Sequence, residues 1–190
     1  ADAAGSERSR LLAARACLEL ARPVDQSARS IRLAIPLDRS LAAKKSAMEA
    51  SLSAYGRAAG YGVAEVTTAA DFAMADLYRD LARALLASER PAGLSAEELE
   101  QYDLLLEEQA YPFEEKAIGI HERNARRARD GIYDRWVRDS YAALAAMKPA
   151  RYGRNETLDG PAATEASAAE LVQALAAARA ALEADDAEAA

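Results

Sequence analysis

Residues 94–131 read LSAEELEQYDLLLEEQAYPFEEKAIGIHERNARRARDG, and this stretch decides the fold because it is typical of one very long helix. Ser95 is followed three residues later by Glu98, the capping-box pattern in which each side chain satisfies the other residue's backbone N–H. Acidic side chains crowd the first turn and arginines crowd the last, which suits the helix dipole. Asp130-Gly131 then supplies a stop signal.

A mainly apolar stripe runs through this stretch in steps of three and four, which is the period of a helix. Its members are Leu99, Tyr102, Leu106, Ala110, Phe113, Ala117, Ile120, Asn124 and Ala128. Such a helix is roughly 50 Å long and needs partners along its length. Pro112 lacks the N–H that would bond the carbonyl of Glu108, so the helix either kinks there or breaks, with Pro112 opening a second helix. The stripe keeps its phase across Pro112, which favours the kink.

The composition predicts an all-α protein. Apolar residues make up 51% of the 190 residues, much of this is alanine, and the chain has only nine glycines and six prolines. Alanine favours helix. The formal net charge of -7 and the pI of about 4.9 argue against a nucleic-acid partner, because a protein that binds the phosphate backbone is normally basic.

A single cysteine, Cys17, excludes an internal disulfide and a thiolate metal cage, and we interpret it as a small buried hydrophobe on an N-terminal helix. No run approaches eighteen apolar residues, so no membrane span is expected. The chain begins Ala1-Asp2-Ala3, with neither a methionine nor a signal peptide. We therefore expect a processed protein or an excised fragment.

Four further helices and two connections are predicted for the body. The helices are Ser6 to Arg22 (ended by Pro23), Leu37 to Ala59, Val63 to Ser88, and Ile132 to Met147 (ended by Pro149). Residues 24–37 are predicted to be a connector. The short turn from Arg90 to Gly93 predicts that the helix before it and the long helix are antiparallel neighbours.

Three regions follow from this pattern. Residues 1–154 form a helical repeat-like domain, residues 155–166 form a polar linker, and residues 167–190 form an alanine-rich C-terminal helix with an acidic tail. The expected architecture is a set of antiparallel long helices in a repeat-like array, of the tetratricopeptide kind, or in a bundle.

No catalytic centre can be recognised in the sequence. His121 is the only histidine, so the paired histidines of zinc proteases are missing, and Ile118 stands where a di-iron Glu-x-x-His unit needs its glutamate. We interpret His121 as a structural or surface residue, with a catalytic base as the alternative. The many carboxylates of the long helix are interpreted as a solvated face. Neither a metal nor a cofactor is predicted.

The candidate residues for binding a partner are arginines and aromatic side chains. The arginines form the only dense basic patch; they either compensate the helix dipole or dock an acidic partner segment. Tyrosine and tryptophan serve helix–helix seams and protein interfaces alike. The candidates are Arg123, Arg126, Arg127, Arg129, Tyr111, Tyr133 and Trp136.

Five segments carry a family resemblance: YGVAEVTTAA (61–70), ALLASERP (84–91), LLLEEQA (104–110), PFEEKAI (112–118) and IYDRWV (132–137). Together they resemble the C-terminal part of large bacterial tetratricopeptide-repeat proteins of the cell envelope, including relatives linked with gliding motility or with TonB/ExbB-like energised systems. The resemblance covers residues 37–154, and residues from Asn155 onward depart from it. It implies a non-enzymatic scaffold in the periplasm and carries over no binding residues.

The predicted function is therefore protein–protein interaction, as a non-catalytic scaffold of a bacterial envelope assembly whose grooved face accepts a partner helix or an extended segment. One alternative is a structural module that mediates self-association within a larger chain. A second alternative is a small-molecule-binding or enzymatic domain built around His121 and Asn124.

Overall fold

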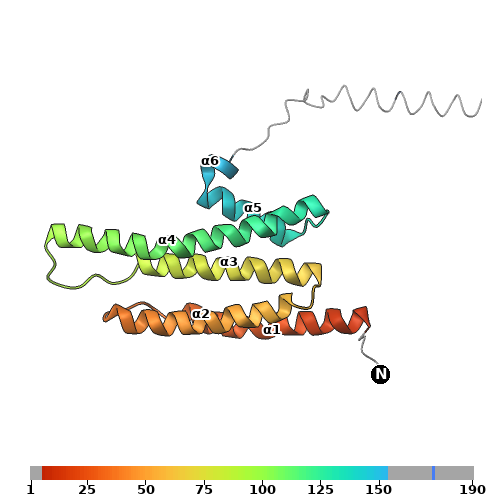
Figure 1. Ribbon diagram of the computed structural model, residues 1–190, viewed down its shortest axis with the longest axis horizontal. Coiled ribbons are helices and arrows are strands. Elements are labelled where there is room, and N and C mark those ends of the chain that lie inside the picture. The colour runs from red at the N-terminus through yellow and green to blue at the C-terminus, as the bar shows by residue number, and fades with distance from the viewer. Residues whose placement is uncertain (1–5, 154–172, 174–190) are drawn as a thin grey trace, which may run out of the picture. The chain divides into compact units, whose positions relative to one another are not determined.

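The computed structural model describes residues 6–153 and Gln173, and within these residues all regular structure is helical (Figure 1). The chain divides into two units, residues 1–154 and 155–190, and the helices named here belong to the first. They are α1 (Glu7–Ser30), α2 (Leu37–Ala59), α3 (Ala64–Leu86), α4 (Ala96–Arg126), the 3₁₀ helix η1 (Arg127–Asp130), α5 (Arg135–Met147) and α6 (Pro149–Tyr152). The predicted all-α class is confirmed for the described part of the chain.

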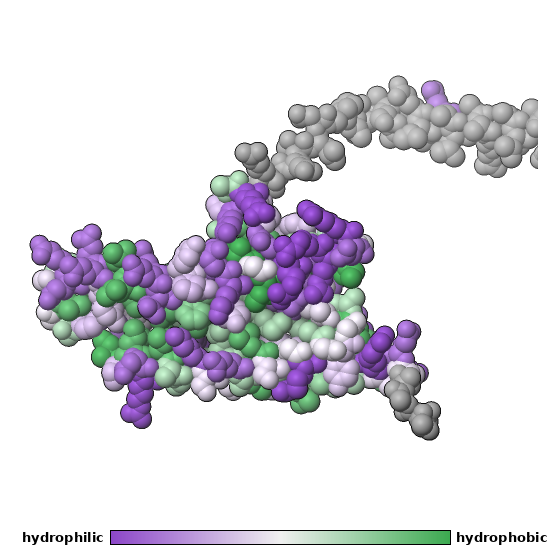
Figure 2. Space-filling model, viewed as in Figure 1, coloured by the Kyte–Doolittle hydropathy of each residue, from purple (hydrophilic) through white to green (hydrophobic). Residues whose placement is uncertain are grey.

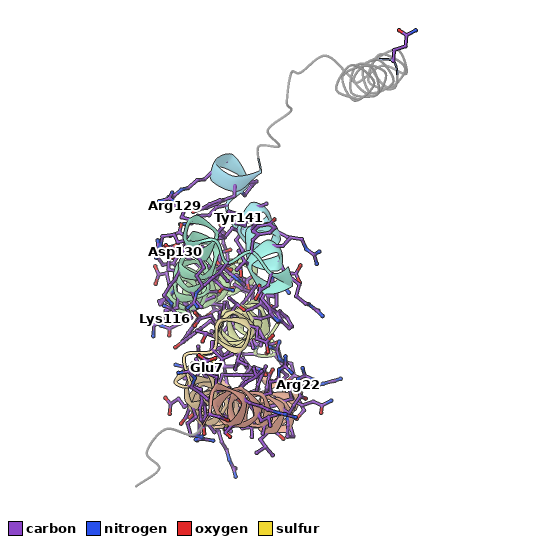
Figure 3. The ribbon with its side chains drawn as sticks, turned by 90° about the vertical axis from the view of Figure 1, so that its right-hand side faces the viewer. Glu7, Arg22, Lys116, Arg129, Asp130 and Tyr141 are labelled. Carbon is purple, nitrogen blue, oxygen red and sulfur yellow. The ribbon has the colours of Figure 1, made fainter. Side chains whose placement is uncertain are left out.

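The long helices of this unit form three layers with α3 in the middle. The antiparallel pair α1 and α2 makes one outer layer, and α4 and α5 make the other (Figures 1 and 3). α3 packs against all four of these helices. It runs antiparallel to α4, as the short intervening turn predicted.

The main apolar cluster sits around α3. Leu77, Leu81 and Leu85 of α3 pack with Met48 and Tyr55 of α2, and all five are nearly inaccessible to solvent. Alanines fill the remaining buried positions: Ala21 of α1, Ala54 of α2, Ala70 and Ala82 of α3, and Ala110 of α4. Because an alanine adds little bulk, the helix axes can approach closely, and the few large side chains supply most of the buried apolar area.

The predicted end of the first helix was wrong, since α1 continues through Pro23 to Ser30. A proline inside a helix costs about 3 kcal/mol, because it removes one hydrogen bond and crowds the preceding turn. Packing on both sides of Pro23 offsets this cost. Ala14, Ala21 and Ala28 recur every seven residues and are fully or almost fully buried.

A polar contact after Pro23 also holds the second half of α1. The hydroxyl of Tyr55 in α2 donates a hydrogen bond to Asp25 at 3.0 Å, and the guanidinium of Arg29 donates to the other oxygen of the same carboxylate. Residues 31–36 alone form the connector, and Leu33 within it is buried. Tertiary contacts thus override the local stop signal.

The long helix begins as predicted. The Ser95 hydroxyl accepts from the backbone N–H of Glu98 at 3.3 Å, and the Ser95 N–H donates to the Glu98 carboxylate at 2.8 Å. α4 runs unbroken through Pro112, so the alternative of a second helix opening there was wrong. After η1 the chain turns at Gly131, whose φ of 78° lies in the left-handed region that glycine adopts without strain.

The last two helices differ in their limits from the prediction. α5 begins at Arg135 instead of Ile132, because the Asp134 carboxylate caps it by accepting from the N–H groups of Trp136 and Val137 at 2.9 and 3.0 Å. Pro149 opens the short α6, where its missing N–H costs nothing. The predicted linker and C-terminal helix, Gln173 apart, lie outside the described residues.

The central position of α3 predicts a large effect of truncating Leu81, which has no exposed surface. Leu81→Ala leaves a cavity in the main cluster and should lower the free energy of unfolding by about 2–5 kcal/mol. Chemical denaturation followed by circular dichroism measures it. Leu86→Ala, at a side chain that is 36% exposed, is the matched control and should cost far less. Equal losses at both positions would contradict this account of the core.

Candidate functional site

A buried polar network fixes α5 on α3 and α4. The Asn124 side-chain amide donates to the backbone carbonyl of Thr68 in α3 at 3.1 Å and to the Ser140 hydroxyl in α5 at 3.0 Å. The Thr68 hydroxyl also bonds Asp134, the cap of α5. Asn124, Thr68 and Ser140 have no exposed surface, so each donor needs its internal partner.

His121 belongs to this network and is fully buried. Its Nδ1 lies 3.3 Å from the Ser140 hydroxyl, and its ring meets Phe72 edge-on at a centroid distance of 5.4 Å. Burial, together with the positive charge of Arg79, lowers the pKa of His121 from its ordinary value of 6.5 to about 4. A neutral imidazole closed off from solvent favours the structural interpretation of His121 over the catalytic one.

The four candidate arginines do lie together, around one hollow at the end of α4. The hollow has a volume of about 550 Å³ and is lined by Arg123, Arg126, Arg127, Arg129, Asp130 and Ile132. Figure 2 shows hydrophilic residues crowding this end of the unit, and Figure 3 places Arg129 and Asp130 beside each other there.

Two of these arginines have an internal role that the sequence did not suggest. Arg123 and Arg127 each donate to Asp71 of α3, at 3.1 and 2.6 Å, and the Asp71 side chain is only 6% exposed. They therefore neutralise a buried carboxylate and tie α4 to α3. Arg126 and Arg129 are exposed, and within the described residues neither has a carboxylate in salt-bridge range.

The three candidate aromatic residues are separated by the structure. Tyr133 is 64% exposed and comes directly after Ile132 of the arginine hollow. Trp136 is half-buried, packed between the Phe72 ring at 5.4 Å and the Arg135 guanidinium at 4.3 Å from its ring centre, so it acts mainly in packing. Tyr111 is 62% exposed and lies on α4 well away from the other two.

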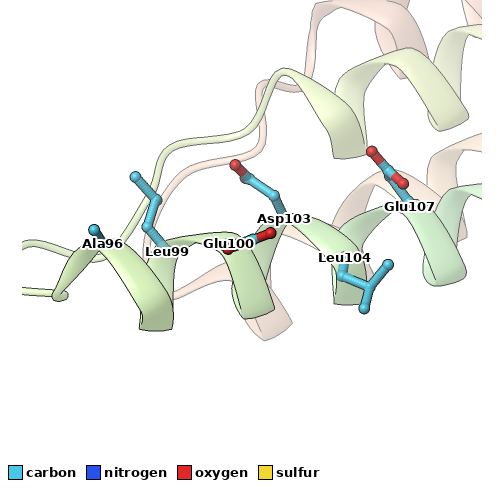
Figure 4. A pocket seen from close by; sticks show the side chains of 6 residues that line it. All are labelled: Ala96, Leu99, Glu100, Asp103, Leu104 and Glu107. Atoms are coloured by element: carbon cyan, nitrogen blue, oxygen red, sulfur yellow. The ribbon is translucent and has the colours of Figure 1, made fainter.

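A second hollow, of about 470 Å³, lies along the first half of α4 and was missed by sequence reasoning. It is lined by Ala96, Leu99, Glu100, Asp103, Leu104 and Glu107 (Figure 4). Leu104 is 57% exposed and points away from Asp103 and Glu107. We call this hollow the α4 groove.

The α4 groove continues the surface on which α5 packs. Glu100, Asp103 and Glu107 precede Ile118, His121 and Ala125 by eighteen residues each. Eighteen residues are five helical turns, so each pair shares one side of α4. Ile118 and Ala125 are buried with Leu144 of α5, and His121 bonds α5 through Ser140. The half of this side that α5 covers is thus buried, and the other half is open.

The mismatch of lengths is the sequence signal that could have shown the groove. The helix that follows Gly131 is the predicted partner of the long helix, but it has fewer than half as many residues as the long helix. It therefore cannot cover the long helix from end to end. The exposed Leu104 and Leu105 stand in the uncovered half, outside the predicted stripe.

Among the residues that the structure describes, no group of three or more His, Cys, Asp or Glu side chains is placed to hold a metal ion. None of the described helices has both the length and the apolar character that crossing a membrane requires, in agreement with the expectation from the sequence. Comparison with protein-family models, with curated proteins and with solved structures finds no match to this chain.

The lowered pKa of His121 predicts a pH-dependent stability. At pH 7 the imidazole is mainly neutral in both the folded and the unfolded state. As the pH falls below 6.5, the unfolded state binds a proton, whereas the folded state binds one only near pH 4. Between these values the protein should lose about 3 kcal/mol of unfolding free energy through this residue. Denaturant titrations at pH 7 and pH 4.5 measure the loss.

The control for this experiment is His121→Gln, which keeps a polar group near Ser140 but does not titrate. Carboxylates that titrate in the same range are common to both proteins, so the difference between the two losses isolates His121. An identical loss in the wild type and in His121→Gln would show that the imidazole does not control this pH dependence.

Proposed function

We propose that this protein is a non-catalytic protein–protein interaction module whose α4 groove accepts a helix of a partner protein. One observation carries the proposal: α5 already packs as a helix on the same side of α4, five turns further along. A surface that binds one amphipathic helix within the chain has a suitable shape for a second, collinear helix.

The lining of the groove defines the chemistry of the partner. Glu100, Asp103 and Glu107 place carboxylates along the middle of the groove, and Leu99 and Leu104 offer apolar contact at its two edges. Of these, Asp103 already pairs with Arg90 of the preceding loop at 2.6 Å. The complementary partner is an amphipathic helix whose lysines or arginines, spaced three or four residues apart, face the carboxylates and whose apolar side chains flank them.

The arginine hollow is proposed as a second contact, for an acidic segment. Arg123 and Arg127 are partly neutralised by Asp71, so the attraction comes mainly from Arg126 and Arg129. Paired guanidinium groups favour carboxylate ligands because their donors fit both oxygens. The exposed Tyr133 extends this surface with an aromatic ring.

The wider role is proposed as a scaffold, built from tetratricopeptide-like helical hairpins, in a bacterial envelope assembly in the periplasm. Antiparallel hairpins agree with this role, and the envelope itself rests on the sequence resemblance. Fractionation of cells that express the natural full-length protein tests the location, and recovery in the cytosol would contradict it. The enzymatic alternative around His121 is disfavoured by the complete burial of that side chain.

A designed peptide tests the groove directly. A labelled eighteen-residue helical peptide with lysines on one face and leucines on both flanks of that face should bind the protein, as fluorescence anisotropy measures. The double variant Leu99→Gln/Leu104→Gln removes the apolar side chains at both edges of the groove without changing charge and should weaken binding by about tenfold or more, since burial of one leucine contributes about 1.5–3 kcal/mol.

Two controls separate the groove from general attraction between a cationic peptide and an acidic protein. Leu20→Gln changes a leucine that is 71% exposed on α1 and should leave the affinity unchanged. A peptide with the same composition but a shuffled order, in which lysines and leucines no longer occupy separate sides of the helix, should bind weakly to every variant. Equal affinity of the wild type and the double variant would refute the groove as the binding site.

A further inference from the structure

A second uncovered surface, different from the groove, runs along the whole of α4. Its residues follow each other in steps of three and four, and every one of them is exposed. They are Glu98, Gln101, Leu105, Glu108, Pro112, Lys116, Gly119, Arg123 and Arg126. Figure 3 shows Lys116 on the side of α4 that faces away from α5. We call this surface the α4 strip.

The α4 strip is symmetric in position about Pro112, and two of its four pairs are opposite in charge. Glu108 and Lys116 each lie four residues from Pro112, and Leu105 and Gly119 each lie seven residues from it. The outer members continue the relation, with Gln101 and Arg123 at eleven residues and Glu98 and Arg126 at fourteen. Distances of four, seven, eleven and fourteen residues are those of a heptad seam.

The charge of the whole helix is divided in the same way. From Glu97 to Glu115 the helix has eight acidic residues and no basic one. From Lys116 to Arg129 it has five basic residues and one acidic residue, Glu122. An antiparallel neighbour with the same sequence would therefore present acid to base at both ends.

We propose that the α4 strip is a self-association surface, on which a second copy of this chain packs antiparallel to the first about a two-fold axis at Pro112. In such an isologous pair each contact is made twice. The inference rests on the proposed function in one respect, that the arginine end of α4 takes an acidic segment; here that segment is the first half of α4 in the second copy.

The members of the strip fit this arrangement. Leu105, which is 57% exposed, faces Gly119 of the second copy, and an added Cβ at Gly119 would meet no atom within 4 Å. The leucine thus packs over a helix backbone that carries no side chain at that point. Glu108 faces Lys116, and Arg126 faces the first turn with Glu97 and Glu98.

The charge of the unit as a whole does not oppose self-association. Residues 6–153 contain 22 Lys and Arg and 22 Asp and Glu, so the net charge of this part is zero. The proposed contact between two α4 strips has few apolar residues and mostly exposed ion pairs. Each of these ion pairs contributes little to the association free energy and is screened by salt. The pair should therefore depend on concentration and dissociate as the ionic strength rises.

Charge exchange in the full-length chain tests the proposal. One variant, Lys116→Glu/Arg126→Glu, makes both halves of the strip acidic. The other, Glu97→Lys/Glu108→Lys, makes both halves basic, and it uses Glu97 because Glu98 closes the capping box. None of these four side chains takes part in a salt bridge among the described residues. Circular dichroism confirms that both variants fold.

Sedimentation equilibrium at low salt, over a wide range of concentration, gives the mass of each sample. The wild type should form dimers, each variant alone should associate about tenfold or more weakly, and an equimolar mixture of the two should recover dimers. Recovery of dimers in the mixture would show that opposite charges on the α4 strip drive association. Dimers of the wild type require the antiparallel orientation, because parallel strips would place like charges against each other. A wild type that stays monomeric, variants that dimerise as well as the wild type, or a mixture that stays monomeric would each overturn the proposal.

A neutral substitution provides a second test that does not depend on charge. Leu105→Gln should weaken the dimer, whereas the matched Leu20→Gln on α1 should not change it. Binding of the designed helical peptide described above tests the α4 groove separately. A wild type that binds the peptide but does not self-associate would overturn this inference alone, and a wild type that dimerises but does not bind the peptide would overturn the groove alone.

Discussion

The 31-residue helix α4 packs on α3 along one side and needs a second helix to cover another side. The helix that does so, α5, has only 13 residues. This mismatch of lengths is the constraint on which the surfaces of the protein depend. Where α5 lies, the second side of α4 is closed by Ile118, Ala125 and Leu144. Where α5 is missing, the equivalent positions carry carboxylates, and leucines beside them remain exposed.

The position of α5 is set by polar groups as much as by apolar ones. Asn124 bonds α3 and α5 at once, and Asp134 caps α5 while it accepts from Thr68 of α3. Such bonds are directional, so sliding α5 along α4 would leave buried donors without acceptors. The network therefore fixes which half of α4 is covered, and with it the place of the open groove.

The sequence predicted the elements whose causes are local. The capping box and the charge gradient of α4 have local causes, and the structure has them as expected. The predicted stripe is buried or half-buried from Tyr102 to Asn124, but Leu99 is exposed and Ala128 lies in η1. The end of α1 failed because the local effect of Pro23 was weighed without Asp25, whose contact with Tyr55 joins residues thirty positions apart. The start of α5 failed by three residues, although Asp134 is a good cap and could have been recognised.

The candidate site was predicted only in part, for the same reason. The grouping of four arginines at one helix end is local and was visible, but their pairing with Asp71 spans 52 and 56 residues and depends on the register of α3 against α4. An aspartate with apolar neighbours on both sides, as Asp71 has in α3, is a usable signal, since a buried carboxylate requires a cationic partner. Trp136 and Tyr111 could not be told apart without knowing which helices cover them.

The groove and the strip lie on different sides of α4, yet they share one charge. The acidic first half of the helix supplies the carboxylates of the groove through Glu100 and Glu107, and it supplies the attraction to a second copy through Glu98 and Glu108. A cationic helix in the groove would neutralise part of this charge. It would therefore weaken the electrostatic attraction between the first half of α4 and the arginine end of α4 in another molecule. Because coupling between two binding events is reciprocal, self-association would weaken the binding of a cationic partner by the same factor. A single helix with segregated charge can thus favour either the partner-bound monomer or the free dimer without any change of fold.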